Sequence, residues 1–234
     1  MSLPNSPRNR PILCYVTDRR ELRPPSPSAS YQPLLRVVES AAKAGIDWIQ
    51  IREKDLSARD CATLTRQALC RAAKSSSGSG VAPRILVNDR VDVAITESAG
   101  GVHLSENSLP VQEAKHLVES RLPLADFLVG ASCHSLDAAV SAAGDGAGYV
   151  IFGPVFPTPS KSIYGPPQGL DRLGEVCRSI AVPVLAIGGL TLDNAASCLS
   201  AGAAGIAAIR LFQDATDIAA MVQALRSECQ ANFL

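Results

Sequence analysis

The chain has 234 residues, of which 47% are hydrophobic, and its 22 basic residues balance 22 acidic ones. This length and composition suit one α/β domain with a sizeable core. The zero net charge argues against a nucleic-acid-binding protein, and no apolar run approaches the ~20 residues of a membrane span. Segment 1–10 lacks the apolar core of a signal peptide, so we expect a disordered tail on a cytoplasmic protein.

Seven cysteines occur at irregular spacing without a CxxC motif. Their odd number and spacing favour reduced thiols in the core of a cytosolic protein over a disulfide framework. Cys133 is the exception to watch, because it lies beside a group of candidate site residues.

Short apolar runs alternate with amphipathic stretches along the chain. The apolar runs predict eight strands, at residues 11–17, 48–52, 84–87, 101–104, 127–131, 149–152, 182–187 and 205–209. The amphipathic stretches predict helices at 32–44, 57–74, 91–97, 111–120, 135–143, 171–180, 193–200 and 215–226. Ser57, Ser135 and either Asp193 or Asn194 are the expected N-caps.

The strands are continuous apolar runs, which is typical of parallel strands buried on both faces. Eight strand–helix units predict a single-domain (β/α)8 TIM barrel over residues 11–234, with an open doubly wound sheet as the alternative. No GxGxxG motif follows the first strand, which argues against a Rossmann fold.

Active sites of such barrels lie at the C-terminal ends of the strands. After the second strand, period two places Gln50, Arg52 and Lys54 on one face, either inside the barrel or as charges on an exposed strand. The other polar residues at strand ends are Thr17, Asp18, Asn88, Asp89, Arg90, His103, Ser105, Glu106, Asn107, Ser108, Ser132, His134 and Arg210.

The sixth strand is followed by the proline-rich loop GPVFPTPSK. Its prolines exclude helix and ladder, and Thr158, Ser160 and Lys161 together suit a phosphate or pyrophosphate. The alternative is a stiff connector with a solvated lysine. Loops of this length in compact domains are usually functional or disordered, and the prolines favour order.

Two anion sites are therefore expected at one end of the barrel. The first is a cationic cradle of Arg52, Lys54 and Lys161, with Arg210 left open as a fourth member. The second is the Gly188–Gly189 pair with the helix start after strand eight, where a phosphate site is common in these barrels. This combination suits an enzyme that joins two small phosphorylated molecules and releases pyrophosphate.

Five segments, WIQIREKD, VNDRVDVA, GASCHS, GPVFPTPSK and AIGGL, resemble the thiamine phosphate synthase/TenI superfamily over residues 11–213. The resemblance implies that aminomethylpyrimidine pyrophosphate loses pyrophosphate with the help of Mg²⁺. The thiazole phosphate nitrogen then attacks the pyrimidinyl carbocation to give thiamine phosphate. These small phosphorylated molecules are the expected partners, with no nucleic acid or membrane, and a homo-oligomer is left open.

The resemblance also implies roles for individual residues. Arg52, Lys54 and Asn88 would bind the pyrophosphate, and Asp89 would bind Mg²⁺. The leaving group would be clamped by Thr158, Ser160 and the catalytic Lys161. Gln50 and the catalytic Ser132 would face the pyrimidine, and Gly189 and the backbone after Ile209 would bind the thiazole phosphate. Gly188 and Arg210 are further substrate-binding candidates because of their place at the ends of strands.

Two positions depart from the synthase pattern. Ser108 stands where the family commonly has a second metal-binding aspartate, and neutral serine binds Mg²⁺ poorly. Arg210 stands where serine is common. Glu106 or Asn107 is the alternative metal ligand, and Arg210 would either strengthen phosphate binding or fill the pocket.

These departures keep the tautomerase branch of the superfamily as an alternative. It moves a proton on thiazole phosphate carboxylate without a metal, and His134 would be its acid/base, or else a residue that only forms hydrogen bonds. We expect His103 to pack instead. A non-catalytic sensor of phosphate ligands is a third alternative. The cradle favours the synthase, because a tautomerase has no use for it.

Overall fold

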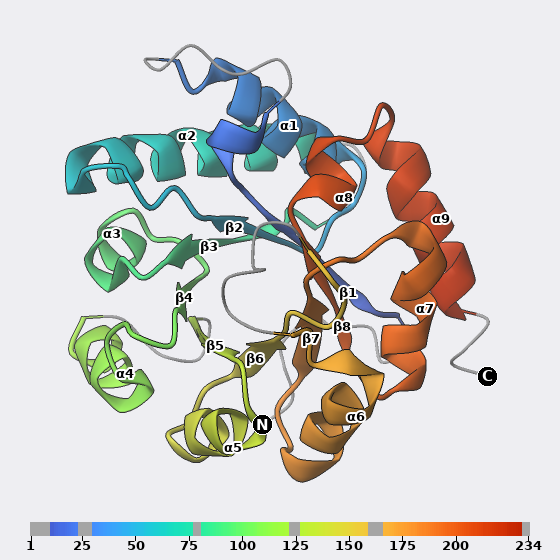
Figure 1. The fold of residues 1–234 in the computed structure, drawn as a ribbon. Helices are drawn as coiled ribbons and strands as arrows, with labels where there is room; N and C mark the ends of the chain where they lie inside the picture. The colour runs from blue at the N-terminus through green and yellow to red at the C-terminus, as the bar shows by residue number, and fades with distance from the viewer. Residues whose placement is uncertain (1–9, 23–29, 77–80, 122–126, 159–165, 231–234) are drawn as a thin grey trace.

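In the computed structural model, residues 10–22, 30–76, 81–121, 127–158 and 166–230 are described, and eight parallel strands close into a barrel. Figure 1 shows this barrel end-on, with the helices arranged around the strands. The strands are β1 (Ile12–Val16), β2 (Trp48–Ile51), β3 (Arg84–Asn88), β4 (Gly101–Leu104), β5 (Leu128–Cys133), β6 (Tyr149–Phe152), β7 (Val184–Ile187) and β8 (Gly205–Ala208). Because β8 pairs with β1, the predicted (β/α)8 barrel is confirmed and the open sheet is excluded.

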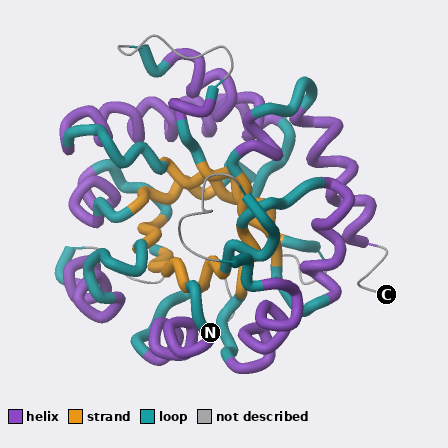
Figure 2. Tube along the Cα trace, viewed as in Figure 1, coloured by secondary structure: helices purple, strands orange, loops and turns teal. Residues whose placement is uncertain are grey.

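A helix follows every strand, and Figure 2 shows these helices as an outer ring. They are α1 (Gln32–Lys43), α2 (Ala58–Ser76), α3 (Val91–Thr96), α4 (Val111–Glu119), α5 (Leu136–Gly144), α6 (Gly169–Ser179), α7 (Leu192–Ser200) and α9 (Ile218–Gln230). No helix in the described ranges is long and apolar enough to span a membrane. Of the predicted tail at residues 1–10, residues 1–9 lie outside those ranges, and Arg10 is paired with Asp47 at 2.7 Å.

The helix caps are confirmed in two cases and corrected in one. Ser57 Oγ accepts a hydrogen bond from the Asp60 amide at 3.2 Å, and Ser135 Oγ accepts one from the Ala138 amide at 3.1 Å. The N-cap of α7 is Thr191, neither Asp193 nor Asn194. The Asn194 side chain instead accepts from the Thr191 amide at 2.9 Å, which is the reciprocal half of a capping box.

Two short helices were not expected. The 3₁₀ turn η1 (Arg19–Glu21) lies inside the predicted loop after β1, and the Asp18 side chain caps it. Helix α8 (Arg210–Gln213) follows β8, so Arg210 begins a helical turn, the strand ends at Ala208 and the last helix starts at Ile218. Segments of three or four residues are too short for a helical period to show in the sequence.

The core has an inner and an outer layer. Alternate strand residues, such as Trp48 of β2 and Leu86 of β3, fill the barrel interior, whereas Ile49 and Ile51 pack outward among the residues of α1 and α2. Both strand faces are thus buried, which explains the unbroken apolar runs. The same alternation decides which polar residues enter the barrel at its C-terminal end.

Candidate active site

A layer of polar side chains replaces the apolar interior at the C-terminal ends of β2 to β5. Gln50, Asn88, His103 and Ser132 each share the inward face of their strand, since the alternate residues pack outward. The strand register places Asn88 beside His103. Four consecutive strands therefore present polar groups to the mouth of the barrel.

Gln50 and Asn88 form the first half of this layer. Gln50 Nε2 donates to Asn88 Oδ1 at 2.7 Å, and Asn88 Nδ2 donates to Asp89 Oδ2 at 2.7 Å. Gln50 is 2% exposed, and its Oε1 has no hydrogen-bond partner among the described residues. Because a buried acceptor without a donor costs about 1–3 kcal/mol, this oxygen marks a place where a ligand donor fits.

Asp89 is held in a left-handed backbone conformation, with φ of 59°. Its Oδ1 accepts from both the amide and the hydroxyl of Ser105, each at 2.7 Å. Burial alone would raise the pKa of this carboxyl, but hydrogen bonds from Ser105 and Ser108 outweigh it, so the pKa lies below its usual range. Asp89 is therefore a firmly ionised carboxylate.

The described ranges contain no group of three or more His, Cys, Asp or Glu side chains that could hold a metal ion. Mg²⁺, however, is commonly bound by one or two carboxylates together with water and substrate phosphates. The donor set of Asp89 with nearby hydroxyls therefore fits Mg²⁺ only if a phosphorylated substrate completes it.

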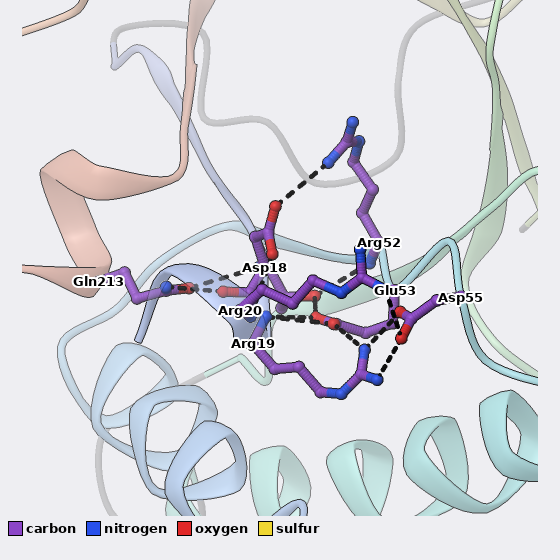
Figure 3. Close-up of polar contacts among 8 residues, drawn as sticks. Asp18, Arg19, Arg20, Arg52, Glu53, Asp55 and Gln213 are labelled. Carbon is purple, nitrogen blue, oxygen red and sulfur yellow. Dashed lines mark hydrogen bonds and ion pairs between the residues drawn. The ribbon is translucent and has the colours of Figure 1, made fainter. Parts of the chain in front are cut away.

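Charged residues from the ends of β1 and β2 form a second cluster, which Figure 3 shows. The buried Glu53 carboxylate accepts from Thr17 Oγ1 at 2.7 Å and from the amide and guanidinium of Arg19 at 3.1 and 3.0 Å. Arg19 also donates to both oxygens of Asp55. Glu53 thus ties the end of β2 to the loop after β1.

Arg52 has a different environment. Its amide donates to Thr17 Oγ1 at 2.9 Å, while its guanidinium extends to the Asp18 carboxylate, 3.7 Å away. In Figure 3 it points away from the Arg19–Asp55 pair. Lys54 is exposed. Arg52 is therefore fixed at its backbone but only loosely paired at its charge.

Arg210 has a similar acidic partner. Its guanidinium lies 3.2 Å from the Glu21 carboxylate, so Asp18 and Glu21 of one short segment pair with both candidate phosphate-binding arginines. Ser160 and Lys161 lie outside the described residues. Thr158 is described and half-buried.

Positions 188 and 189 require glycine, because the loop after β6 packs closely against both. Both residues have positive φ, 99° and 66°, and a Cβ on Gly188 would lie 2.5 Å from Pro154 Cβ. The Phe156 amide donates to the Gly188 carbonyl at 3.0 Å. These glycines therefore hold the proline-rich loop against β7, and their binding of a phosphate stays a prediction.

The hydrogen bonding of His103 was not predicted from the sequence. This residue is 2% exposed; its Nε2 lies 2.8 Å from Ser132 Oγ and its Nδ1 lies 3.1 Å from the Tyr149 hydroxyl. It does pack on Tyr149, with ring centroids 5.6 Å apart. Period two along β4 is the sequence signal that places it inside the barrel with Ser132.

His134 lies at the edge of this site. Its Nδ1 donates to the Gly153 carbonyl, and its Nε2 is 4.0 Å from the Glu106 carboxylate. The neighbouring Cys133 packs outward, and burial together with Glu106 raises its pKa to about 12. Cys133 is thus a protonated core thiol, and none of the described residues around it activates it.

Comparison with known proteins gives one consistent result. A family model described as thiamine monophosphate synthase matches residues 14–212. A putative thiamine-phosphate synthase of Geobacter sulfurreducens is 41% identical over 197 residues, 84% of each chain. A thiamine-phosphate synthase of Roseiflexus castenholzii is 37% identical over 219 residues, 94% of this chain and 88% of that protein.

A solved structure is similar as well. It is the thiamine phosphate pyrophosphorylase from Pyrococcus furiosus, with a TM-score of 0.78 and 30% sequence identity. The match covers 96% of this chain and 98% of the other. Sequence and fold therefore agree over nearly the whole length.

Proposed function

We propose that this chain, which belongs to the thiamine monophosphate synthase family, joins aminomethylpyrimidine pyrophosphate to thiazole phosphate and releases pyrophosphate. The observation that carries this proposal is the inward polar layer of Gln50, Asn88 and Ser132, with an unpaired acceptor on Gln50. A carbon–oxygen bond of the first substrate breaks, its electrons leave with pyrophosphate, and a nitrogen of the second substrate forms the new bond to carbon.

The polar layer suits an aminopyrimidine. Such a ring presents an amino donor and ring-nitrogen acceptors, and Gln50 Oε1 is an acceptor without a donor. Ser132 adds a hydroxyl on the same inward-facing layer. We expect Gln50 to accept from the amino group, which would satisfy its buried oxygen and orient the ring.

Cations at the barrel mouth would stabilise charge as it develops on the departing pyrophosphate. Arg52 and Lys54 supply two of them, and the family pattern assigns Thr158, Ser160 and Lys161 to the same task. Arg52 is suited to this because its guanidinium is held at 3.7 Å from Asp18, farther than a direct hydrogen bond.

The ionised Asp89, with the nearby hydroxyls, is where Mg²⁺ would bind once a pyrophosphate supplies further oxygens. The ion would neutralise part of the pyrophosphate charge and make it a better leaving group. Asp89 itself is held ready by Ser105 and Asn88, so little reorganisation is needed.

The second substrate needs its own phosphate site. We expect Gly188 and Gly189, together with Arg210 and the backbone after Ile209, to bind the thiazole phosphate. Arg210 lies at the start of α8, directly after β8, which is where phosphates commonly bind in these barrels.

The test is an assay of the purified protein with both substrates and Mg²⁺. We expect equal amounts of thiamine phosphate and pyrophosphate, loss of the reaction with EDTA, and a fall of about 100-fold or more for Lys161→Ala. A Gln50→Leu variant should raise KM for the pyrimidine substrate. Absence of product from well-folded protein would contradict the proposal.

One observation keeps a second activity in view. The His134 Nδ1 proton is bound to the Gly153 carbonyl, which leaves Nε2 as the nitrogen able to take up a proton. If the synthase assay fails, the same protein should be given the non-aromatic thiazole tautomer. Aromatisation that is lost in His134→Asn would then identify a tautomerase.

A further inference from the structure

Three polar groups form a chain across the barrel interior, and two of them have no role in the reaction described above. Tyr149 of β6 is fully buried and its hydroxyl lies 3.1 Å from His103 Nδ1. The His103 Nε2 lies 2.8 Å from Ser132 Oγ on β5. Ser132 itself is only half-buried, so the chain leads from the closed interior to the ligand side.

The direction of these hydrogen bonds follows from the phenol. Burial raises the pKa of Tyr149 well above its ordinary value, so the hydroxyl keeps its proton. Within the part of the chain that the structure describes, this hydroxyl is hydrogen-bonded to His103 Nδ1. A neutral imidazole has one donor and one acceptor nitrogen. When the phenol donates to Nδ1, the ring proton must lie on Nε2, which then donates to Ser132.

We propose that Tyr149 and His103 are positioning residues that fix Ser132 as a hydrogen-bond donor toward the substrate. Once Ser132 Oγ accepts from His103, its own proton must point to another acceptor. The matching ligand group is an acceptor atom on the pyrimidine substrate. This last step rests on the proposed function, whereas the order of the three protein groups does not.

The surroundings of Tyr149 hold this chain in place. Trp48 packs on its ring with centroids 4.8 Å apart. Gly130, two residues before Ser132 on β5, leaves the space that the ring fills, since a Cβ there would lie 2.1 Å from ring atoms. The phenol is thus fixed from two sides, as is typical of groups that orient a catalytic residue.

The first experiment measures the tautomer of His103 by ¹⁵N NMR at a pH where the imidazole is neutral. His103→Gln assigns its signals among those of the three histidines. We expect the Nε2–H form in the wild-type protein and loss of that preference in Tyr149→Phe. Tyr15→Phe is the matched control, because it also removes a fully buried hydroxyl, bonded to Gln213 at 2.8 Å. A wild-type Nδ1–H form would overturn the proposal.

The second experiment separates positioning from stability. Tyr149→Phe should lower kcat about tenfold with little change in KM, whereas Tyr15→Phe should leave kcat unchanged. In a Ser132→Ala background, Tyr149→Phe should cause no further loss. An equal loss in both backgrounds would show that Tyr149 does not act through Ser132. If the wild type lacks synthase activity, the NMR result still decides the tautomer, so the two proposals fail separately.

Discussion

Asp89 is the residue on which the proposed Mg²⁺ binding would depend, because it is the carboxylate at the end of the inward polar layer. Its oxygens already accept from Ser105 and Asn88, and Ser108 adds a further hydrogen bond. Ser108 stands where the family commonly has a second acidic ligand. Its hydroxyl lies close enough to Asp89 for a substituted carboxylate to share a cation.

We therefore expect Ser108→Asp to strengthen Mg²⁺ binding. Two adjacent carboxylates repel one another without a cation, so the variant should melt at a lower temperature in EDTA and recover more stability on addition of Mg²⁺. The Mg²⁺ concentration for half-maximal rate should fall roughly tenfold, since affinity follows the charge of the ligands. Ser108→Asn is the neutral control, and an equal response from it would refute the shared site.

Glu53 allows a prediction about pH. Burial raises the pKa of Glu53, despite the opposing hydrogen bonds from Thr17 and Arg19. The folded state therefore binds a proton more tightly than the unfolded state, in which the pKa is about 4.3. The free energy of unfolding should fall as pH rises from that value through the raised folded pKa.

Urea unfolding of the wild-type protein and of Glu53→Gln between pH 4 and 7 isolates this contribution. The difference in unfolding free energy between them should change across the window, because the amide does not titrate. A difference that stays constant with pH would contradict the raised pKa. At the upper end of this pH range, Glu53→Gln lacks the charge-assisted hydrogen bonds that Arg19 donates to the Glu53 carboxylate, each worth about 1.5–3 kcal/mol.

The sequence was enough to predict which residues face the candidate site, but it did not predict which side chains pair with one another there. Period two along buried strands is enough to place Gln50 and Ser132 inside the barrel. It could not show that Arg52 lies beyond the last residue of β2 with Asp18 as its partner, because that pairing joins two loops. His103 was expected only to pack, because its two hydrogen bonds join it inside the barrel to side chains of two other strands, Ser132 of β5 and Tyr149 of β6.

At the scale of elements, the segment after β1 is the least expected part of the site. The turn η1 and the residue that caps it bring Asp18 to Arg52 and Glu21 to Arg210. Both carboxylates therefore lie beside arginines that a bound phosphate would need. A bound pyrophosphate would therefore compete with this segment for the positive charge.

Asp18→Asn should accordingly tighten the binding of free pyrophosphate. Asparagine preserves the cap of η1 and removes only the charge. Because exposed ion pairs are worth about 0.2–1 kcal/mol, we expect Kd to fall about threefold at low salt and the effect to shrink at high salt. Isothermal titration measures it. Asp55→Asn, which removes an equal charge from the Arg19 pair, is the control and should not tighten binding through Arg52.

The long elements were predictable because apolar runs and helical periods extend over enough residues to show. The bounds of β4 and β6 agree with the sequence to the residue. Helices η1 and α8 were missed because three or four residues carry no period. Functional barrels place such short turns at the mouth, so the least predictable elements are those nearest the candidate site.

At the scale of the whole molecule, the two ends of the barrel have separate tasks. The polar layer lies at the C-terminal ends of the strands. At the opposite end, Arg226 of α9 lies 2.6 Å from Asp47, which also accepts from the Leu13 amide at 2.8 Å. Arg226 donates to the Pro11 carbonyl as well, so the last helix is tied to the first two strands.

Arg226→Ala should therefore destabilise the protein without changing its chemistry. Both partners are largely buried, with side chains 14% and 15% exposed, and removing one partner of such a pair costs about 3 kcal/mol. Urea unfolding should show this loss, while kcat at low temperature stays at the wild-type value. Arg66→Ala breaks an ion pair in which the Arg66 side chain is 69% exposed and should cost under about 1 kcal/mol.

Arg52→Ala should show the reverse pattern, with reduced kcat at nearly unchanged stability. Loss of kcat in Arg226→Ala would mean that the barrel transmits strain from one end to the other.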